Sequence, residues 1–484
     1  MDTQRYNNLD KQFIGGKWLV GHSAKAIHNI NPYTQETIFE MAAADQNDVD
    51  AAYQSAQTAY GSWSKTSTDE RKNLLLKVIE IMQTRREEIV DWLINESGSA
   101  RLKANIEVDA ATAIITEAAT FPDRLNTKRL DTSVEGQESY VYQQALGVIS
   151  VITSWNFPFH LSMRSVATAL AIGNTVVIKP ASDTPVTGGF LIAKLFEEAG
   201  CPAGVLNVIA GSGTEIGDYF VLHPTSKMIS FTGSTEVGQH VGELAVGGKN
   251  LKRVALELGG NAPLVVLDDA DLDLAVELAV MGRFMHQGQV CISTNRVIVD
   301  AKVYDGFVAK IAERAKTLTY GDPSKEDTLL GPIINASQVN KIKEIINKAQ
   351  QQGAKLIFSA PIEGNVIPPH ILVDVDPHFA VAQEESFGPV LPILKANDEA
   401  HALALANDTE YGLSSAVCTG DYDRGLKFAL GIEAGMTHIN SISVADAPNA
   451  PFGGEKNSGL GRFNGEWILH EFSRPHWISL QHYG

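Results

Sequence analysis

The chain has 484 residues and an acidic balance, with 39 Lys or Arg against 57 Asp or Glu and a formal net charge of −18. This charge argues against nucleic acid or an anionic membrane as a partner, and no apolar run approaches the ~20 residues that span a bilayer. The three cysteines, Cys201, Cys291 and Cys418, are too few and too widely spaced for a disulfide framework or a zinc motif, so we expect a soluble, cytoplasmic protein without a metal.

Two segments precede the first predicted strand of the main sheet. In residues 69–98, apolar side chains recur at helical spacing and the charged run 85–88 marks a solvent-facing side, which predicts one long packing helix. Residues 124–144 are polar and alternate around Tyr140 and Tyr142. This pattern predicts either a protruding hairpin that pairs with a partner chain or a solvated linker.

From Gly147 onward, short β-branched runs alternate with helical stretches. Alternation of this length predicts βαβ units and a parallel sheet, which binds ligands at the carboxyl ends of its strands. A second series of the same kind follows Gly260 and predicts a second α/β domain. In the first series we expect strands at residues 148–153, 175–179, 205–209 and 228–232, and helices at 161–172, 186–199 and 215–222. In the second we expect strands at 263–267, 296–300, 355–358 and 390–394, and helices at 272–281, 304–316 and 336–352.

Three residues carry the strongest chemical signals. Cys291 lies in a turn beside glycine and glutamine and is the best candidate for an accessible thiolate, whereas the other two cysteines fit buried positions. Glu257 is flanked by apolar residues and glycines, which raises a carboxyl pKa and suits a general base, although a buried ion pair fits equally well. Asn156 follows the first predicted strand, where its amide either donates to an oxyanion or shapes a turn.

Two turns with glycine begin predicted helices. Gly213 follows the strand at 205–209, and Gly233 with Ser234 follows the strand at 228–232. Free N–H groups at a helix N-terminus bind phosphate. Two such turns on neighbouring strands favour a dinucleotide over a single phosphate.

These segments together resemble the aldehyde dehydrogenase superfamily over nearly the whole chain. The resemblance depends on seven motifs in the right order, and three further segments, at residues 284–289, 461–467 and 476–479, resemble the benzaldehyde and vanillin dehydrogenase branch. The seven motifs are Trp-Asn-Phe-Pro (155–158), Lys-Pro (179–180), Phe-Thr-Gly-Ser-Thr-Glu-Val-Gly (231–238), Glu-Leu-Gly-Gly (257–260), Gly-Gln-Val-Cys (288–291), Glu-Ser-Phe-Gly-Pro (385–389) and Pro-Phe-Gly-Gly (451–454).

The resemblance implies oxidation of an aldehyde, of the aromatic type, to its acid. Cys291 is then the nucleophile that forms a thiohemiacetal and a thioester. The Asn156 side-chain amide and the Cys291 backbone N–H hold the oxyanion. Glu257 activates the water that hydrolyses the thioester, which favours the free acid over acyl transfer to coenzyme A.

The resemblance also implies NAD or NADP as cofactor. Many NAD-specific members carry a glutamate three residues after the Lys-Pro lysine, and this chain has Ser182 there. A serine does not repel a 2′-phosphate and Lys179 attracts one, so we expect NADP to be accepted as well as NAD. The expected contacts are Lys179 and Ser182 at the adenosine ribose, Gly213, Gly233 and Ser234 at phosphate, Glu385 at the nicotinamide ribose, and Trp155 and Phe387 near the ring.

Two residues after the Asn156 turn bear on the substrate. Phe157 is expected to line a flat apolar tunnel, unless it only packs the core. Arg164 lies eight residues after Asn156, where an arginine resembles the carboxylate anchor of semialdehyde dehydrogenases. An alternative function is therefore semialdehyde oxidation, and an ordinary helix ion pair would explain Arg164 as well.

The expected architecture is a Rossmann-like NAD(P)-binding domain, a second α/β catalytic domain and a small β oligomerisation arm. We assign residues 1–123 and 146–257 to the first, 258–443 to the second, and 124–145 with 471–484 to the arm. Residues 444–470 are expected to return near the active site. The arm implies a homodimer or homotetramer, with a small-molecule aldehyde as the other partner.

Overall fold

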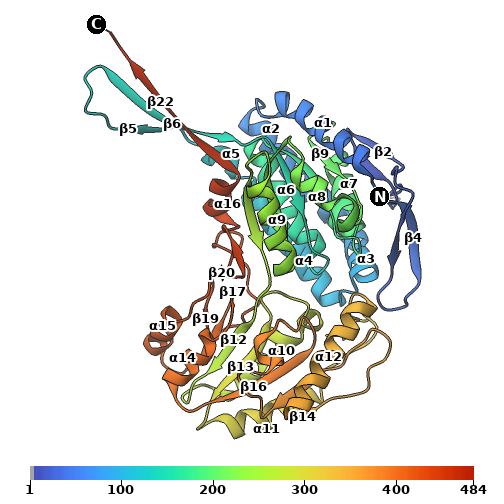
Figure 1. Ribbon diagram of the computed structural model, residues 1–484, viewed down its shortest axis with the longest axis vertical. Helices are drawn as coiled ribbons and strands as arrows, with labels where there is room; N and C mark the ends of the chain where they lie inside the picture. Colours follow the sequence, from blue (N-terminus) through green and yellow to red (C-terminus); the bar gives the residue numbers. More distant parts are fainter. Residues whose placement is uncertain (1–4, 484) are drawn as a thin grey trace.

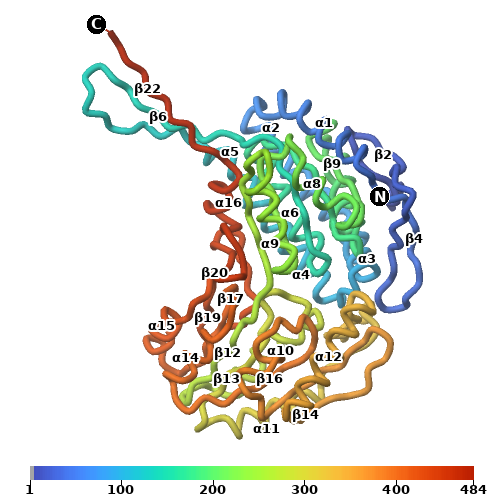
Figure 2. Tube along the Cα trace, viewed as in Figure 1, coloured from blue at the N-terminus to red at the C-terminus, as the bar shows by residue number. Residues whose placement is uncertain are grey.

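The computed structural model describes residues 5–483, which form two α/β lobes and a projecting arm (Figure 1). An eight-stranded sheet is the core of the first lobe, and a seven-stranded sheet is the core of the second. The trace in Figure 2 enters the second lobe in its yellow-green part and returns from it in its red part. The predicted α/β architecture with two mainly parallel sheets is confirmed. None of the helices within residues 5–483 combines the length and apolarity needed to cross a membrane.

The first sheet carries its parallel strands in the spatial order β9-β8-β7-β10-β11. β7 comes first in the chain yet lies in the middle, so the strand order reverses between β7 and β10. At such a reversal the loops that follow the two strands diverge and leave a crevice at the carboxyl ends. The parallel strands are β7 (Val148–Ile152), β8 (Thr175–Lys179), β9 (Leu206–Val208), β10 (Ser226–Thr232) and β11 (Arg253–Glu257), and the antiparallel edge strands are β1 (Gln12–Ile14), β2 (Lys17–Leu19) and β21 (Gly459–Leu460).

Helices cover both faces of this sheet. All residues of α6 are buried, because α2, α4 and the sheet enclose it. Two expected helices begin with a π-helical turn, η1 (Val186–Phe190) before α7 and η2 (Gly213–Gly217) before α8. The helices are α1 (Gln46–Trp63), α2 (Thr68–Thr84), α3 (Arg86–Ser97), α4 (Arg101–Ala118), α5 (Phe121–Arg124), α6 (Pro158–Ile172), α7 (Leu191–Glu198), α8 (Asp218–Leu222) and α9 (Thr235–Gly247).

The single long helix expected over residues 69–98 is wrong. The chain breaks at Arg85, whose φ of −104° and ψ of 16° end α2 and precede α3. The Arg85 guanidinium forms ion pairs with Glu88 at 3.1 Å and Glu198 at 2.7 Å, which favour the break. Because both helices bury their apolar side chains in one core, the apolar spacing continues through the break and does not reveal it.

The second sheet has the order β14-β15-β16-β13-β12-β18-β19 and is parallel except for β14. Every residue of β12 and β13 is buried, as expected for parallel strands covered on both faces. The strands are β12 (Ala262–Val266), β13 (Thr294–Asp300), β14 (Lys355–Phe358), β15 (His370–Val373), β16 (Val390–Ala396), β18 (Ala416–Cys418) and β19 (His438–Ile439). Helices α10 (Leu272–Phe284) and α11 (Tyr304–Ala315) cover one face, and α12 (Ala336–Gln352), α13 (Ala380–Gln383), α14 (Glu399–Asn407) and α15 (Tyr422–Leu430) the other.

The arm is a three-stranded sheet that projects from the first lobe (Figure 1). β5 (Lys128–Leu130) and β6 (Gln137–Ala145) form a hairpin, and β22 (Ser473–Gln481) pairs antiparallel with β6 along its full length. The hairpin predicted for residues 124–144 is confirmed, and the linker alternative is wrong. The remaining elements are β3 (Ala26–Ile30) paired with β4 (Thr37–Ala42), β17 (Tyr411–Gly412) paired with β20 (Glu455–Lys456), α16 (Gly465–Glu471) and the short helix η3 (Met285–Gly288).

Candidate active site

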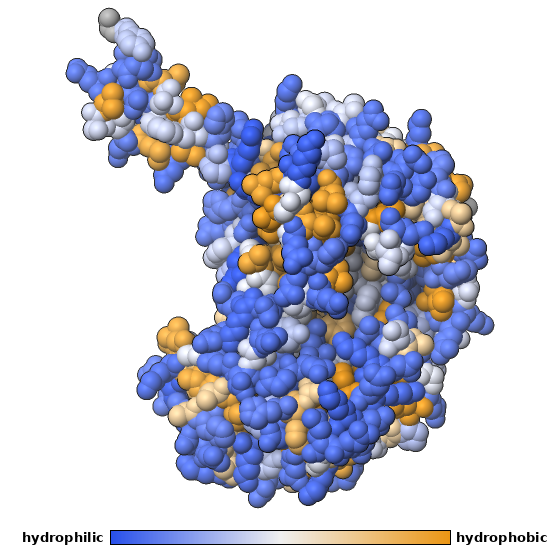
Figure 3. Space-filling view, in the orientation of Figure 1, coloured by the Kyte–Doolittle hydropathy of each residue, from blue (hydrophilic) through white to orange (hydrophobic). Residues whose placement is uncertain are grey.

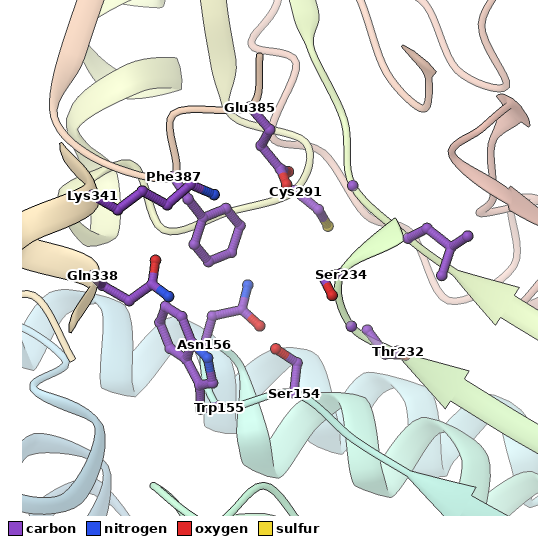
Figure 4. A pocket seen from close by; sticks show the side chains of 13 residues that line it. Ser154, Trp155, Asn156, Thr232, Ser234, Cys291, Gln338, Lys341, Glu385 and Phe387 are labelled. Atoms are coloured by element: carbon purple, nitrogen blue, oxygen red, sulfur yellow. The ribbon is translucent and has the colours of Figure 1, made fainter. Parts of the chain in front are cut away.

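Two cavities meet at Cys291 and Asn156, which line both of them. The polar cavity opens at the carboxyl ends of β7 and β10, where the strand order reverses (Figure 4). The apolar cavity lies between α4, the start of α6 and residues 444–452, and has a volume of about 310 Å³. The other walls of the polar cavity are Ser154, Trp155, Thr232, Gly233, Ser234, Leu258, Gly259, Gln338, Lys341, Glu385 and Phe387.

Asn156 is held from two sides in the connection between β7 and α6. Its side-chain amide donates to the Gln289 carbonyl at 2.9 Å, two residues before Cys291. Lys103 Nζ donates to the Asn156 backbone carbonyl at 2.7 Å and forms a buried ion pair with Glu107 on α4. Glu107 also accepts two backbone N–H groups at the start of α6, at 2.9 and 3.2 Å. The Asn156 turn is therefore fixed to both α4 and the Cys291 loop, and a second amide hydrogen remains for a ligand.

The two glycines after Glu257 allow close packing at the junction of the cavities. A Cβ at Gly259 would lie 2.8 Å from a Glu385 carboxylate oxygen, and one at Gly260 would lie 2.3 Å from the Cys291 carbonyl oxygen. The Gly260 N–H donates to Glu385 at 2.9 Å. A side chain at either position would displace Glu385 or Cys291, so the Glu-Leu-Gly-Gly motif has a steric basis here.

Glu257 is the last residue of β11 and is only 1% exposed. Neither of its carboxylate oxygens has a hydrogen-bond partner within the described part of the chain. Burial raises the pKa of Glu257 to about 8, although Arg164 and Arg462 lower it and Asp446 adds to the rise. A carboxyl group with this pKa and no partner suits a general base. The alternative of a structural ion pair is not observed among residues 5–483.

The Cys291 thiol is half-buried at the junction. Burial and then the negative charges of Glu257 and Glu385 raise the pKa of this thiol, against an opposing effect of Arg164. These effects favour the thiol over the thiolate, and the thiolate expected at Cys291 stays a prediction. The thiol has to lose its proton before it can act as a nucleophile.

Aromatic rings and a helix N-terminus form the rest of the polar cavity. The rings of Trp155 and Phe387 lie edge to face, with centroids 5.3 Å apart (Figure 4). Gly233 and Ser234 follow β10, and the Ser234 side chain caps α9. The structure thus brings Trp155, Gly233, Ser234, Glu385 and Phe387 together with Asn156 and Cys291 around one cavity.

Three further predicted cofactor residues lie outside these walls. Lys179 ends β8, Ser182 follows three residues later, and Gly213 opens η2 after β9. Because β8 and β9 lie beside β7, all three are at the same edge of the sheet. The single hydrogen bond of Lys179 Nζ within residues 5–483 is a 3.5 Å contact with the Pro180 carbonyl, and burial lowers its pKa to about 8. A buried ammonium with so weak a partner fits an oxygen-rich ligand such as a ribose or a phosphate.

Phe157 and Arg164 were expected at the substrate, and only Phe157 lines the apolar cavity. Phe157 lines it, whereas Phe159, two residues on, is fully buried in the core. Arg164 does not line either cavity and is 1% exposed. Its guanidinium stacks between the rings of Phe452 and Phe463, at 4.7 and 4.4 Å from their centroids. This stack places the Arg164 charge behind the cavity wall and not in the space a substrate would fill.

Sequence reasoning missed several polar residues around the two cavities. Gln338 and Lys341 reach the polar cavity from α12 in the second lobe (Figure 4), and no local motif marks them. His160 and Asp446 line the apolar cavity. A histidine in the first turn of a mostly apolar helix is a signal that could have found His160. Lys103 could have been found from its spacing of four residues to Glu107 on one helix face.

Comparison with known proteins agrees with this geometry. Residues 18–478 match the profile of the aldehyde dehydrogenase family. A vanillin dehydrogenase of Corynebacterium glutamicum is 53% identical over 481 residues, which cover 99% of each chain. The crystal structure of an NAD-dependent benzaldehyde dehydrogenase from Corynebacterium glutamicum has a TM-score of 0.91 at 50% identity and covers 98% of this chain and 97% of that one. An NADP-dependent Escherichia coli enzyme has a TM-score of 0.95 at 34% identity and covers 98% and 99%. The resemblance stated from the motifs is confirmed, and the chain belongs to the aldehyde dehydrogenase family.

Proposed function

We propose that the protein oxidises aromatic aldehydes to carboxylic acids with NAD or NADP. The observation that carries this proposal is the apolar cavity that ends on Cys291 and Asn156, the same two residues that the polar cavity reaches. A flat ring fits walls formed by Phe157, Phe452 and aliphatic side chains. The aldehydes named for the two Corynebacterium glutamicum relatives, vanillin and benzaldehyde, support this substrate class.

Each residue at the junction has a chemical task in this proposal. Cys291 loses its thiol proton to solvent, and the thiolate Sγ then attacks the aldehyde carbon. The Asn156 amide and the Cys291 backbone N–H donate to the oxyanion, an effect worth ~3–4 kcal/mol per donor. Glu257 then takes a proton from the water that hydrolyses the thioester, so the free acid is the product and not a coenzyme A ester.

The bound dinucleotide supplies the acceptor for the hydride that leaves the substrate carbon. We place its nicotinamide end in the polar cavity, where Glu385 holds the ribose and Trp155 and Phe387 flank the ring. The free N–H groups at the start of α9 suit the pyrophosphate. Gly233 and Ser234 would hold the phosphates of the dinucleotide. Lys179, Ser182 and Gly213 would hold its adenosine half.

Two residues at the carboxyl edge of the first sheet, Lys179 and Ser182, support acceptance of both NAD and NADP. Ser182 brings no carboxylate to repel a 2′-phosphate, and the weakly partnered Lys179 ammonium attracts one. We expect the kcat/KM values for NAD and NADP to differ by no more than a few tens of fold. A preference for NAD beyond about a thousandfold, roughly 4 kcal/mol, would contradict this expectation.

The proposed function is tested with a panel of benzaldehyde, vanillin, succinic semialdehyde and short aliphatic aldehydes, with each cofactor. Absorbance of the reduced nicotinamide measures the rates, and we expect kcat/KM for the aromatic aldehydes to exceed the others by ~10-fold or more. Equal values across the panel would refute the aromatic assignment. Coenzyme A should leave the rate unchanged.

Semialdehyde oxidation with Arg164 as carboxylate anchor is not favoured. The Arg164 guanidinium is enclosed between two rings and does not line the apolar cavity. An anionic substrate would also meet the Asp446 carboxylate in that cavity.

We also propose that the domains follow the boundaries expected from sequence. Residues 1–123 and 146–257 then bind the cofactor, and residues 258–443 carry Cys291. Residues 124–145 and 471–484 form the oligomerisation arm, and residues 444–470 return beside the active site. The placement of β21 next to β11 and of Phe452 in the apolar cavity supports the role of this return segment.

The arm and a nearby apolar surface support assembly into a homodimer or homotetramer. β22 is an edge strand with no partner on its outer side among residues 5–483, and its Trp477 and Leu480 side chains are 66% and 47% exposed. Figure 3 shows apolar surface over α9, whose Val237 and Val246 are exposed, as is Leu251 in the loop that follows. Exchange of Trp477 and Leu480 for arginine should lower the mass measured by light scattering, whereas an unchanged mass would count against pairing through the arm.

A further inference from the structure

The apolar cavity has a second pair of polar residues in its walls, besides the two at the reacting site. Asn156 and Cys291 are the polar residues at the reacting site, and the other polar residues in the cavity walls are His160 and Asp446. These two come from distant parts of the chain, the first turn of α6 and the segment between β19 and β20. In a mainly apolar cavity, a few polar groups fix the orientation of the ligand. The hydrogen-bonded pair of His160 and Asp446 is therefore a candidate for orienting the substrate.

The Asp446 carboxylate is held in place and keeps free acceptor positions. Its Oδ1 accepts a hydrogen bond from Asn464 Nδ2 at 2.6 Å, and its Oδ2 lies 3.0 Å from His160 Nε2. A carboxylate accepts about four hydrogen bonds, so two positions remain. The Asp446 side chain is 21% exposed and that of His160 is 7% exposed, so the carboxylate is the more accessible member of the pair.

The charge state of Asp446 suits an acceptor. Burial raises its pKa, but the hydrogen bond and charge of His160 and the charge of Arg164 outweigh burial and leave the pKa below its usual value. The group is thus an ionised acceptor at neutral pH. His160 Nδ1 is also buried without a partner among the described residues.

We propose that Asp446, positioned by His160 and Asn464, accepts a hydrogen bond from a hydroxyl group on the ring of the substrate. This inference rests on the proposed aromatic aldehyde function and names its substrate class as hydroxybenzaldehydes. An unsubstituted ring leaves the carboxylate without this donor, and a methoxy group in place of the hydroxyl has no hydrogen to donate. A carboxylate on the substrate would be repelled.

The test compares 2-, 3- and 4-hydroxybenzaldehyde, each with its methoxy counterpart and with benzaldehyde. At the ring position that reaches Asp446, we expect kcat/KM for the hydroxy compound to exceed both references by roughly 10- to 100-fold, the range for a hydrogen bond to a charged group. Asp446→Ala should bring this ratio close to one, and Asp446→Asn, which keeps a neutral acceptor, should lower it several-fold.

Val444→Ala is the matched control, because it enlarges the same wall without a change in charge. It should alter kcat/KM for hydroxy and methoxy substrates alike and leave their ratio intact. If Asp446→Ala fails to fold, the inhibition constants of 4-hydroxybenzyl and benzyl alcohol against wild type and Asp446→Asn measure the same preference.

The outcomes separate this inference from the proposed function. A wild-type ratio near one at all three ring positions, with benzaldehyde still oxidised, overturns the Asp446 subsite alone. A high ratio that survives in Asp446→Ala overturns it as well. Failure of every aromatic aldehyde to react would instead overturn the proposed function.

Discussion

The polar and apolar cavities reach the same thiol but are built in different ways. Most residues that line the polar cavity lie at the carboxyl ends of parallel strands, and its glycines permit contacts that a Cβ would block. The apolar cavity is formed by side chains from four separate segments. The first is therefore fixed by the topology of the sheet, whereas the second changes with single substitutions. Variants at the junction should abolish all activity, and variants further away should affect one cavity at a time.

The largest effect is expected where the two cavities share a residue. Cys291→Ala removes the nucleophile and should lower kcat by ~10⁴-fold or more for every aldehyde and with both cofactors. Reduced-nicotinamide absorbance measures this loss, and an unchanged melting temperature shows that the fold is intact. Substantial turnover by this variant would overturn the mechanism.

A smaller loss with a distinctive time course is expected at Glu257. Because burial raises the pKa of Glu257 to about 8, its basic form disappears as the pH falls through that value, and wild-type kcat should decline with it. Glu257→Gln should lose this dependence, and steady turnover should drop ~10²–10⁴-fold after an initial burst of reduced cofactor. Rapid-mixing kinetics from pH 6 to 10 tests both points. A wild-type rate that is constant through pH 8 would contradict the role of Glu257 as base.

Lys103 tests how far the junction depends on support from α4. Lys103→Met removes the donor to the Asn156 carbonyl and should lower kcat/KM by ~100-fold. It also leaves Glu107 buried without its ion-pair partner, which costs about 3–5 kcal/mol of stability.

The double variant Lys103→Met with Glu107→Gln, which keeps a side-chain acceptor for the two α6 N–H groups, separates these two effects. It removes both charges and should regain stability in denaturant unfolding while kcat/KM stays low. Full recovery of kcat/KM together with stability would mean that Lys103 serves only the fold.

The smallest effect should be confined to the cofactor side. Ser182→Glu places a carboxylate near the expected 2′-phosphate and should lower kcat/KM for NADP by ~10-fold, with a much smaller change for NAD. The ratio between aldehydes should not change. Equal losses with both cofactors would show that Ser182 does not lie beside the 2′-phosphate.

The difference between the polar and the apolar cavity also explains which of their residues could be predicted from the sequence. Strand-end residues such as Asn156, Ser234 and Glu257 follow from strand–helix alternation and glycine motifs, since local patterns place them. His160 and Asp446 are 286 residues apart and meet only through tertiary packing. The raised pKa of the Cys291 thiol could not be predicted from local sequence for a similar reason, because burial and the charges of Glu257 and Glu385 act through space. The break at Arg85 left no trace in the apolar periodicity on either side of it.

The arm has a consequence for the order of events during synthesis. Trp477 on β22 donates a hydrogen bond to Ser139 on β6, although 338 residues separate them. At 5–20 residues per second, a ribosome needs roughly 20–70 seconds to make that intervening chain. Throughout this interval the edge of β6 that later pairs with β22 has no partner strand, because β22 has not yet been made. The flanking charges of β6, Lys128, Arg129, Glu135 and Glu138, are suited to keep that edge from pairing with the wrong strand.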